Sequence, residues 1–396
     1  MRIVKLLLLT TILSLIPGQL IRITITQNSA ANITDLLVLI TNIYFLTYII
    51  IARKKVKVPA FIAPFGVIFI IAAAASSLLS LNTFTKNEVM VATLFLIRLI
   101  LYCSIGLITV NTIKKDEIKK FINLFITIGF VFTILGFLQL VLYPDLSSLQ
   151  TYGWDPHINR LVSTTLDPNF TGGLLTVFIS ICVSMFLYYR NAKYALFSLF
   201  FSIALLLTFS RSSYFAYAVS MFLISMVKSP KIILVPIILF VISFTLVSTV
   251  RIRIIGALTI DETAMSRIES WHNALVIIRD QPIFGIGFNN YRNAQRHYGF
   301  LSENDLDGGH SGAGTDSSFL LVLATTGLFG FALFLAWLSS ILVVIMKNLK
   351  TSFLGLALFS TSIALFVHSQ FVNSLFYPQI LMPFIFLVGL KYVQDI

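Results

Sequence analysis

The sequence predicts an all-α membrane protein that crosses the bilayer many times. Of its 396 residues, 57% are hydrophobic and 11% are charged, whereas roughly 25% are charged in an average soluble domain. The apolar residues form runs long enough for the about 20 residues that one helical crossing needs. These runs are continuous rather than alternating, which indicates membrane helices and not barrel strands.

About twelve apolar segments satisfy this length requirement. We interpret the first, residues 3–25, as an uncleaved helix rather than a signal peptide, because it continues past Pro17 and Gly18 without a convincing cleavage site. The others are expected at 33–52, 58–80, 89–111, 121–143, 169–189, 194–210, 213–228, 232–250, 317–345, 352–371 and 378–394. The chain is therefore expected to be a single integral membrane domain over residues 1–396.

Basic residues divide between the two sides of the predicted bundle. With the N-terminus inside, nearly every lysine falls in a cytoplasmic segment, including the RKKVK run at 53–57, as the retention of basic loops in the cytoplasm requires. Most arginines, histidines and acidic residues then fall on the outer side. We therefore expect a plasma-membrane protein whose chemistry faces outward.

The long outer segment 251–316, between the predicted ninth and tenth helices, is expected to contain amphipathic helices. The stretch SRIESWHNALVIIRD begins at Ser266, which can cap a helix, and Pro282 ends the run. We expect this helix to lie along the outer membrane surface. Spacings of three or four place four residues on one of its faces: Arg267, Trp271, Leu275 and Ile278.

Arg211, in TFSRSSY, lies between two predicted helices at the outer membrane boundary. Burying its charge is costly without an anionic partner or water. One interpretation is that it reaches lipid headgroups or pairs with a carboxylate. The other is that Arg211, Arg267 and Arg160 bind a phosphate or diphosphate through forked hydrogen bonds that lysine cannot form. Arg98, within the fourth predicted helix, is at least as well explained by a structural ion pair.

The segment GGHSGAGTDSSFLLVLATTGLFG, residues 308–330, joins a polar, glycine-rich stretch to the tenth predicted helix. It brings His310 and Asp316 to the membrane boundary, where either could accept or orient the proton of an attacking hydroxyl. Asp316 could instead cap the helix, and His310 could be an ordinary loop residue.

Further polar residues are weaker candidates for substrate binding. DPN at 167–169 most economically indicates a turn and a helix start, although Asp167 and Asn169 are also candidate ligands. The remaining candidates lie in the outer loops, where a solvated loop face would explain them equally well: His157, Tyr291, Arg292 and Arg296.

In combination, these motifs resemble the O-antigen polymerase and O-antigen ligase superfamily. The resemblance depends on the 267–291 segment, the Ser210–Arg211 pair, DPN and the boundary motif. The ligase pattern has a histidine, then Asn, Ser or Gln, nine residues and Gly-x-x-Gly. Here Asp316, Ser317, nine residues, Gly327 and Gly330 fit that spacing. The aspartate in the histidine's place favours the polymerase branch.

The resemblance implies a metal-independent glycosyltransferase of the GT-C class, with a GT-C-like fold and no cofactor. Its expected partners are undecaprenyl-diphosphate-linked oligosaccharide repeat units, the lipid bilayer, and a flippase and chain-length regulator, with no nucleic acid. Arg211, Arg267, Asp316 and His310 would then be the catalytic residues. Two other functions remain open: a ligase of the same superfamily, and a flippase or other transporter, although transporters more often carry repeats and interrupted helices near the membrane midplane.

Overall fold

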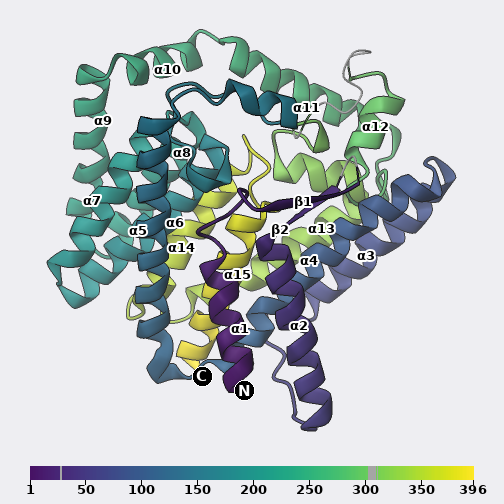
Figure 1. Cartoon of the computed structure of the whole chain (residues 1–396), viewed down its shortest axis with the longest axis horizontal. Coiled ribbons are helices and arrows are strands. Elements are labelled where there is room, and N and C mark those ends of the chain that lie inside the picture. The colour runs from purple at the N-terminus through teal and green to yellow at the C-terminus, as the bar shows by residue number, and fades with distance from the viewer. Residues whose placement is uncertain (27–28, 302–308, 310) are drawn as a thin grey trace.

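The computed structural model describes residues 1–26, 29–301, 309 and 311–396, and it confirms the all-α class (Figure 1). A bundle of apolar helices carries two further helices across one of its ends. The elements are α1 (Arg2–Leu13), β1 (Arg22–Thr26), β2 (Ser29–Asn32), α2 (Ile33–Ile51), α3 (Phe65–Leu79), α4 (Lys86–Thr112), α5 (Ile118–Leu142), α6 (Pro168–Tyr189), α7 (Ala192–Leu207), α8 (Arg211–Val227), α9 (Leu234–Leu246), α10 (Ser248–Leu258), α11 (Glu262–Asp280), α12 (Tyr291–His297), α13 (Ser318–Met346), α14 (Phe353–His368) and α15 (Pro378–Asp395), with short 3₁₀ turns between them.

Fewer helices than the expected twelve are long enough to cross a membrane on their own. Within the described part of the chain, six helices are long and apolar enough, or seven if the bent pair α9 and α10 forms one span. The apolar helices α7 and α14 are shorter. Each predicted segment nevertheless coincides with a helix, so the chain is a multi-pass membrane protein in which several crossings are short or broken.

The prediction for the first segment is wrong beyond Leu13. Pro17 lacks an amide hydrogen and Gly18 has φ +51, so the chain turns there instead of continuing as a helix. Residues 22–26 and 29–32 then form an antiparallel pair of strands. Arg98 packs beside this hairpin, where it donates to the Ala30 carbonyl and forms an ion pair with Asp35 at 2.8 Å. The structural interpretation of Arg98 is therefore confirmed.

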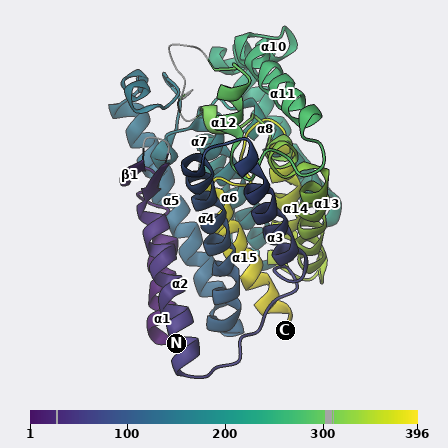
Figure 2. The ribbon, with the colours of Figure 1, turned by 90° about the vertical axis from the view of Figure 1, so that its right-hand side faces the viewer.

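Helix α6 is the centre of the bundle, and almost all of its residues are buried. It packs on α7, α8 and α14, as the turned view shows (Figure 2). Gly172 allows the close contact with α8, since a Cβ at that position would lie 2.2 Å from the Ser213 hydroxyl. The start of α6 and the start of α8 are thereby held against each other.

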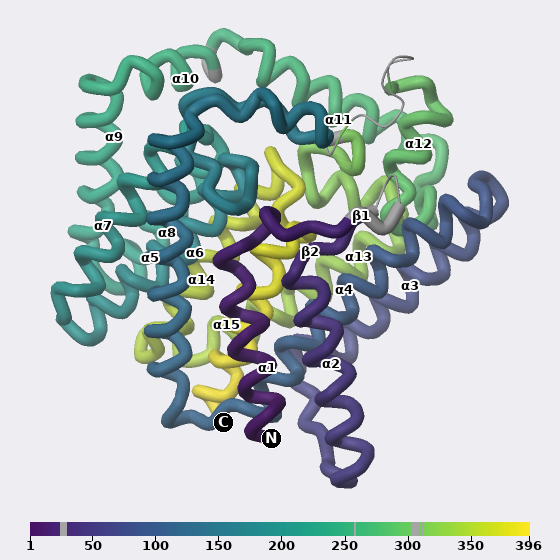
Figure 3. The backbone as a smooth tube through the Cα atoms, in the orientation of Figure 1, coloured from purple at the N-terminus to yellow at the C-terminus, as the bar shows by residue number. Residues whose placement is uncertain are grey.

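The chain turns sharply between α9 and α10, which are bent by 103°. Beyond this bend, α10 and α11 run across the end of the bundle (Figure 3), and α11 contacts α13. The expected outer helix is therefore present, but its buried face is carried by Ala274 and Ile277, whereas Leu275 is 46% exposed. It also begins earlier than expected, because Asp261 rather than Ser266 is its N-cap.

A break in helix α13 attaches the segment that follows α11 to the bundle. Gly327 has φ +65, and a Cβ there would lie 2.2 Å from the Ile283 carbonyl oxygen. The Leu328 and Phe329 amides, which lose their helical partners at the break, donate to the carbonyls of Pro282 and Ile283. The segment after α11 is therefore joined to α13 by backbone hydrogen bonds. The chain reverses direction at Gly285, which has φ +69.

Candidate functional site

Four helices begin near one another at one end of the bundle, and the residues at and close to their starts form the candidate site. Helices α6, α8, α11 and α13 begin after the capping residues Asp167, Ser210, Asp261 and Ser317, whose side chains accept hydrogen bonds from backbone amides of their first turns. The N-terminus of a helix carries a partial positive charge and attracts anions. The site therefore favours a negatively charged ligand before any side-chain charge is considered.

A buried network sets the position of the first turn of α8. The Ser210 hydroxyl donates to Asn169 Oδ1 at 2.7 Å, and the Ser213 hydroxyl donates to the Asn169 carbonyl at 3.2 Å. Ser213 Oγ also lies 3.2 Å from His368 Nε2 of α14. Because Asn169 lies on α6 and His368 on α14, these bonds join the first turn of α8 to two other helices and so fix the position of Arg211, which lies between Ser210 and Ser213.

Arg211 is paired with Asp261 through two hydrogen bonds of 3.0 Å each. The hydrogen bonds from Arg211 and from the Ala264 amide outweigh the partial burial of Asp261 and lower the pKa of its carboxyl. The Asp261 side chain is 31% exposed and that of Arg211 is 14% exposed. The carboxylate-pairing interpretation of Arg211 thus describes this state, in a pair that solvent still reaches.

Arg267 lies on α11, six residues after Asp261. It makes no hydrogen bond or ion pair to any residue that the structure describes. Burial lowers the pKa of the Arg267 guanidinium, and the charge of Arg211 lowers it further. The negative charge of Asp316 is the strongest influence in the opposite direction, and Asp167 and Asp261 act in the same sense as Asp316. A partly buried guanidinium whose five N–H donors have no acceptor among the described residues is available to an anionic ligand.

Asp316 faces Arg267 from the start of α13, and its carboxylate is not the cap of that helix. Ser317 has that role, since its hydroxyl accepts from the Leu320 amide. The capping interpretation of Asp316 is therefore wrong. The backbone of Asp316 is held instead by α11, where the Ser270 hydroxyl accepts from its amide and the Trp271 indole donates to its carbonyl.

The environment of Asp316 suits a carboxyl that exchanges a proton near neutrality. Burial raises its pKa to about 6, and the charges of Asp155 and Asp167 add to this rise, while Arg267 opposes it. A general base is most effective when its pKa lies close to the working pH. The side chain has the chemical properties of such a base.

The loop before α6 contributes three of the expected substrate ligands, all with structural contacts. Arg160 donates to the carbonyls of Thr208 and Phe209 at 2.9 and 3.4 Å. Asp167 accepts from the amides of Asn169 and Phe170, and its other oxygen lies 3.7 Å from His157 Nε2. The DPN motif is thus a helix start, as its simpler interpretation predicted. Asp167 and Arg160 lie close enough to Arg267 for their charges to act on it.

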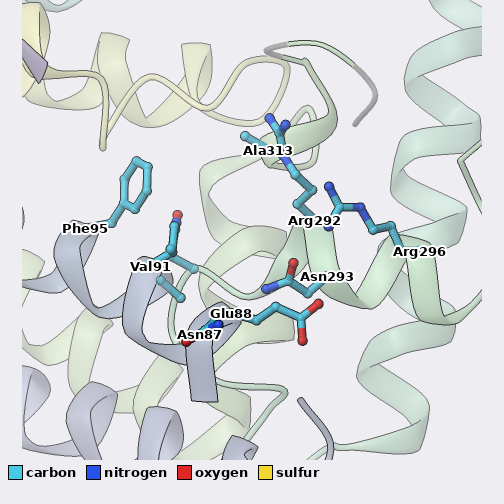
Figure 4. A pocket seen from close by; sticks show the side chains of 10 residues that line it. Asn87, Glu88, Val91, Phe95, Arg292, Asn293, Arg296 and Ala313 are labelled. Carbon is cyan, nitrogen blue, oxygen red and sulfur yellow. The ribbon is translucent and has the colours of Figure 1, made fainter. Parts of the chain in front are cut away.

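The other expected ligands lie apart from this cluster or beyond the described residues. Tyr291 is 1% exposed and belongs to a small apolar core with Ala274 and Leu321. Arg292 and Arg296 line a separate pocket between α4 and α12 (Figure 4). His310 lies outside the residues that the structure describes. Among the described residues there is no group of three His, Cys, Asp or Glu arranged to hold a metal ion.

The sequence reasoning did not single out Asp261, Ser213 or Asp155. Asp261 carried a detectable signal, because an aspartate three residues before Ala264 in an acidic first turn is a good N-cap. Ser213 could have been suspected from Gly172, whose missing side chain makes room for it. Asp155 carries no local pattern, and its closeness to Asp316 comes from the path of the loop.

Part of the chain matches the model of a known protein family. The family model described as "O-Antigen ligase" matches residues 169–335, which begin at the first turn of α6 and end within α13. The matched region includes Arg211, Arg267 and Asp316. No curated protein matches the chain.

Proposed function

We propose that this chain is a polysaccharide polymerase of the plasma membrane. The match of residues 169–335 to the family model described as "O-Antigen ligase" supports the coarser assignment to the membrane glycan transferases of the O-antigen ligase and polymerase superfamily. In the proposed reaction it transfers a growing glycan from undecaprenyl diphosphate onto an undecaprenyl-diphosphate-linked repeat unit at the outer face. A flippase would supply the repeat units, and a chain-length regulator would act with the enzyme.

The observation that carries this proposal is the proximity of Arg267 on α11 to Asp316 at the start of α13, close enough for each charge to act on the other. Arg267 is a guanidinium without a protein acceptor among the described residues, and Asp316 is a carboxyl whose pKa is raised to about 6. A transfer from a lipid diphosphate needs both functions, since negative charge develops on the leaving group and the acceptor hydroxyl must lose its proton.

The proposed step exchanges one bond at the anomeric carbon for another. An oxygen of the acceptor sugar attacks that carbon, and the bond from the carbon to the diphosphate oxygen breaks. The hydroxyl proton passes to the Asp316 carboxylate, and undecaprenyl diphosphate leaves with its charge held by Arg267 and Arg211. Arg211 would exchange its Asp261 partner for a phosphate oxygen, which the exposure of that pair allows.

A ligase that moves the glycan onto a different lipid is the second candidate, and the printed description of the matched family favours it. Asp316, which stands where the ligase pattern has histidine, favours the polymerase. The acceptor separates the two functions, because a polymerase uses another copy of its own repeat unit.

Purified protein in detergent, given only the lipid-linked repeat unit, should form a ladder of longer lipid-linked glycans without any membrane gradient. Products are resolved by gel electrophoresis and mass spectrometry. Extension that occurs only when a foreign lipid acceptor is added would identify a ligase. A folded protein that binds the lipid but makes no product with either acceptor would favour the transporter.

Asp261→Asn should lower the apparent KM for the lipid donor while changing kcat little. Asparagine keeps the N-cap of α11 but no longer competes for Arg211. Because the pair is partly exposed, the gain is that of an exposed ion pair, about 0.2 to 1 kcal/mol, or up to about fivefold in KM. Glu262→Gln, an exposed neighbour in the same turn, is the matched control. A large loss of activity in Asp261→Asn alone would instead mean that the pair holds Arg211 in its working position.

A further inference from the structure

A pocket of about 230 Å³ with a mixed polar and apolar lining lies between the first turns of α4 and helix α12 (Figure 4). Its residues belong to two walls and two connecting segments. They are Asn87, Glu88, Val91, Ala92 and Phe95 of α4, Arg292, Asn293 and Arg296 of α12, and Asn289 and Ala313.

The lining combines the two kinds of surface that a carbohydrate subsite requires. Amide, carboxylate and guanidinium groups of Asn87, Glu88, Asn293 and both arginines supply donors and acceptors, which suits sugar hydroxyls because each hydroxyl both donates and accepts. Val91, Ala92 and Phe95 provide the apolar patch that the C–H face of a sugar ring can cover. The charged and amide groups in the lining do not suit a lipid tail alone, and the volume is below the about 300 Å³ at which drug-sized ligands begin to fit.

Phe95 is held in place by a residue that faces the core of the protein. The guanidinium of Arg98 lies 5.2 Å from the centre of the Phe95 ring, and Arg98 is itself fixed by Asp35 and the Ala30 carbonyl. One side of the Phe95 ring is thus covered by Arg98, which leaves the rest of the ring to the pocket.

The pocket is connected to the candidate active site by the segment that leads into α13. Arg292 donates to the Gly309 carbonyl at 2.6 Å, and Gln295 donates to the Gly312 carbonyl at 2.7 Å. Ala313, which lines the pocket, lies three positions before Asp316. Gly309 also packs against Gly153, two residues before Asp155. The same short segment therefore borders both places.

We infer that this pocket binds one sugar ring of the glycan substrate, outside the ring that reacts beside Asp316. The inference rests on the proposed function for its glycan, and it adds a subsite that selects the repeat unit by its hydroxyl pattern. The pocket would hold the glycan in register while Arg267 and Arg211 hold the diphosphate. It contributes to binding and specificity, not to the bond-making step.

The test measures two ligands separately on purified protein in detergent. The first probe is the repeat-unit oligosaccharide released by mild acid from the lipid carrier of the cells that make this protein, and the second is undecaprenyl diphosphate. The variant Asn87→Ala/Asn293→Ala should bind the oligosaccharide about tenfold more weakly, since two hydrogen bonds of about 1 kcal/mol are lost or partly replaced by water. Its affinity for undecaprenyl diphosphate should be unchanged, which also shows that it is folded.

Two comparisons complete the test. Lys86→Ala removes an exposed residue next to Asn87 that does not line the pocket, and it should leave both affinities unchanged. In the transfer reaction, the double variant should raise KM for the repeat unit at constant kcat. Equal oligosaccharide binding by the double variant and the unsubstituted protein overturns the subsite while leaving the proposed function intact. Absence of transfer by the unsubstituted protein, with either acceptor, contradicts the proposed function instead.

Discussion

Arg267→Ala should abolish polymer formation while the protein still inserts and folds. Arg267 makes no hydrogen bond or ion pair to a described residue, so its removal breaks no such contact within that part of the chain. The expected loss comes from the transition state. A charge pair about 4 Å apart at an effective dielectric near 20 is worth roughly 4 kcal/mol, or about a thousandfold in rate.

The measurement is polysaccharide chain length in cells together with product formation by purified protein, and Arg279→Ala is the control. Arg279 lies on the same helix and is exposed, so it matches the change in charge without touching the site. Arg211→Ala should cause a comparable loss, with some loss of stability as well, because it leaves Asp261 without its partner. Long-chain product from cells carrying Arg267→Ala would remove the basis for a bound diphosphate.

Asp316→Asn should reduce kcat by a factor of about 10² to 10⁴, the usual contribution of a general base. Asparagine has a similar shape and leaves the backbone contacts to Ser270 and Trp271 in place. The loss therefore reports on the proton rather than on folding. Ser317, which caps α13, is unaffected by the change.

The pH profile provides a second readout of the same residue. Asp316 accepts a proton only in its ionised form, and its pKa is raised to about 6. Activity of the unsubstituted protein should consequently fall as the pH is lowered through about 6 and level off above it. Asp316→Asn should lose this acidic limb. A profile that keeps the same limb in the variant would assign the titration to another group.

The sequence predicted the fold class and most helix positions because both follow from local composition. Runs of apolar residues specify helices in lipid, and caps such as Asp167 at α6 can be identified from the residues beside them. The failure at residues 14–25 has a local cause as well: Pro17 and Gly18 were treated as tolerated within a span, and they end the helix. The short crossings were harder to predict, because α7 and α14 gain their stability from packing on α6 rather than from length.

The candidate site was predicted in part. Arg211, Arg267 and Asp316 were named because arginine is unusual at an outer boundary and because of the motif spacing, and the structure places them at neighbouring helix starts. The partner of Arg211 could not be predicted, since Asp261 reaches it only through the 103° bend between α9 and α10. Tyr291 was placed among substrate ligands by its polar neighbours, yet its helix turns it into a small apolar core.

The break at Gly327 gives a different meaning to the glycines of the boundary motif. Gly327 allows the backbone of residues 282–286 to form hydrogen bonds with α13. These bonds keep α11, which carries Arg267, from sliding along α13, which begins beside Asp316. The acid–base group proposed at Asp316 and the backbone contacts that hold its helix against α11 are therefore carried by different residues.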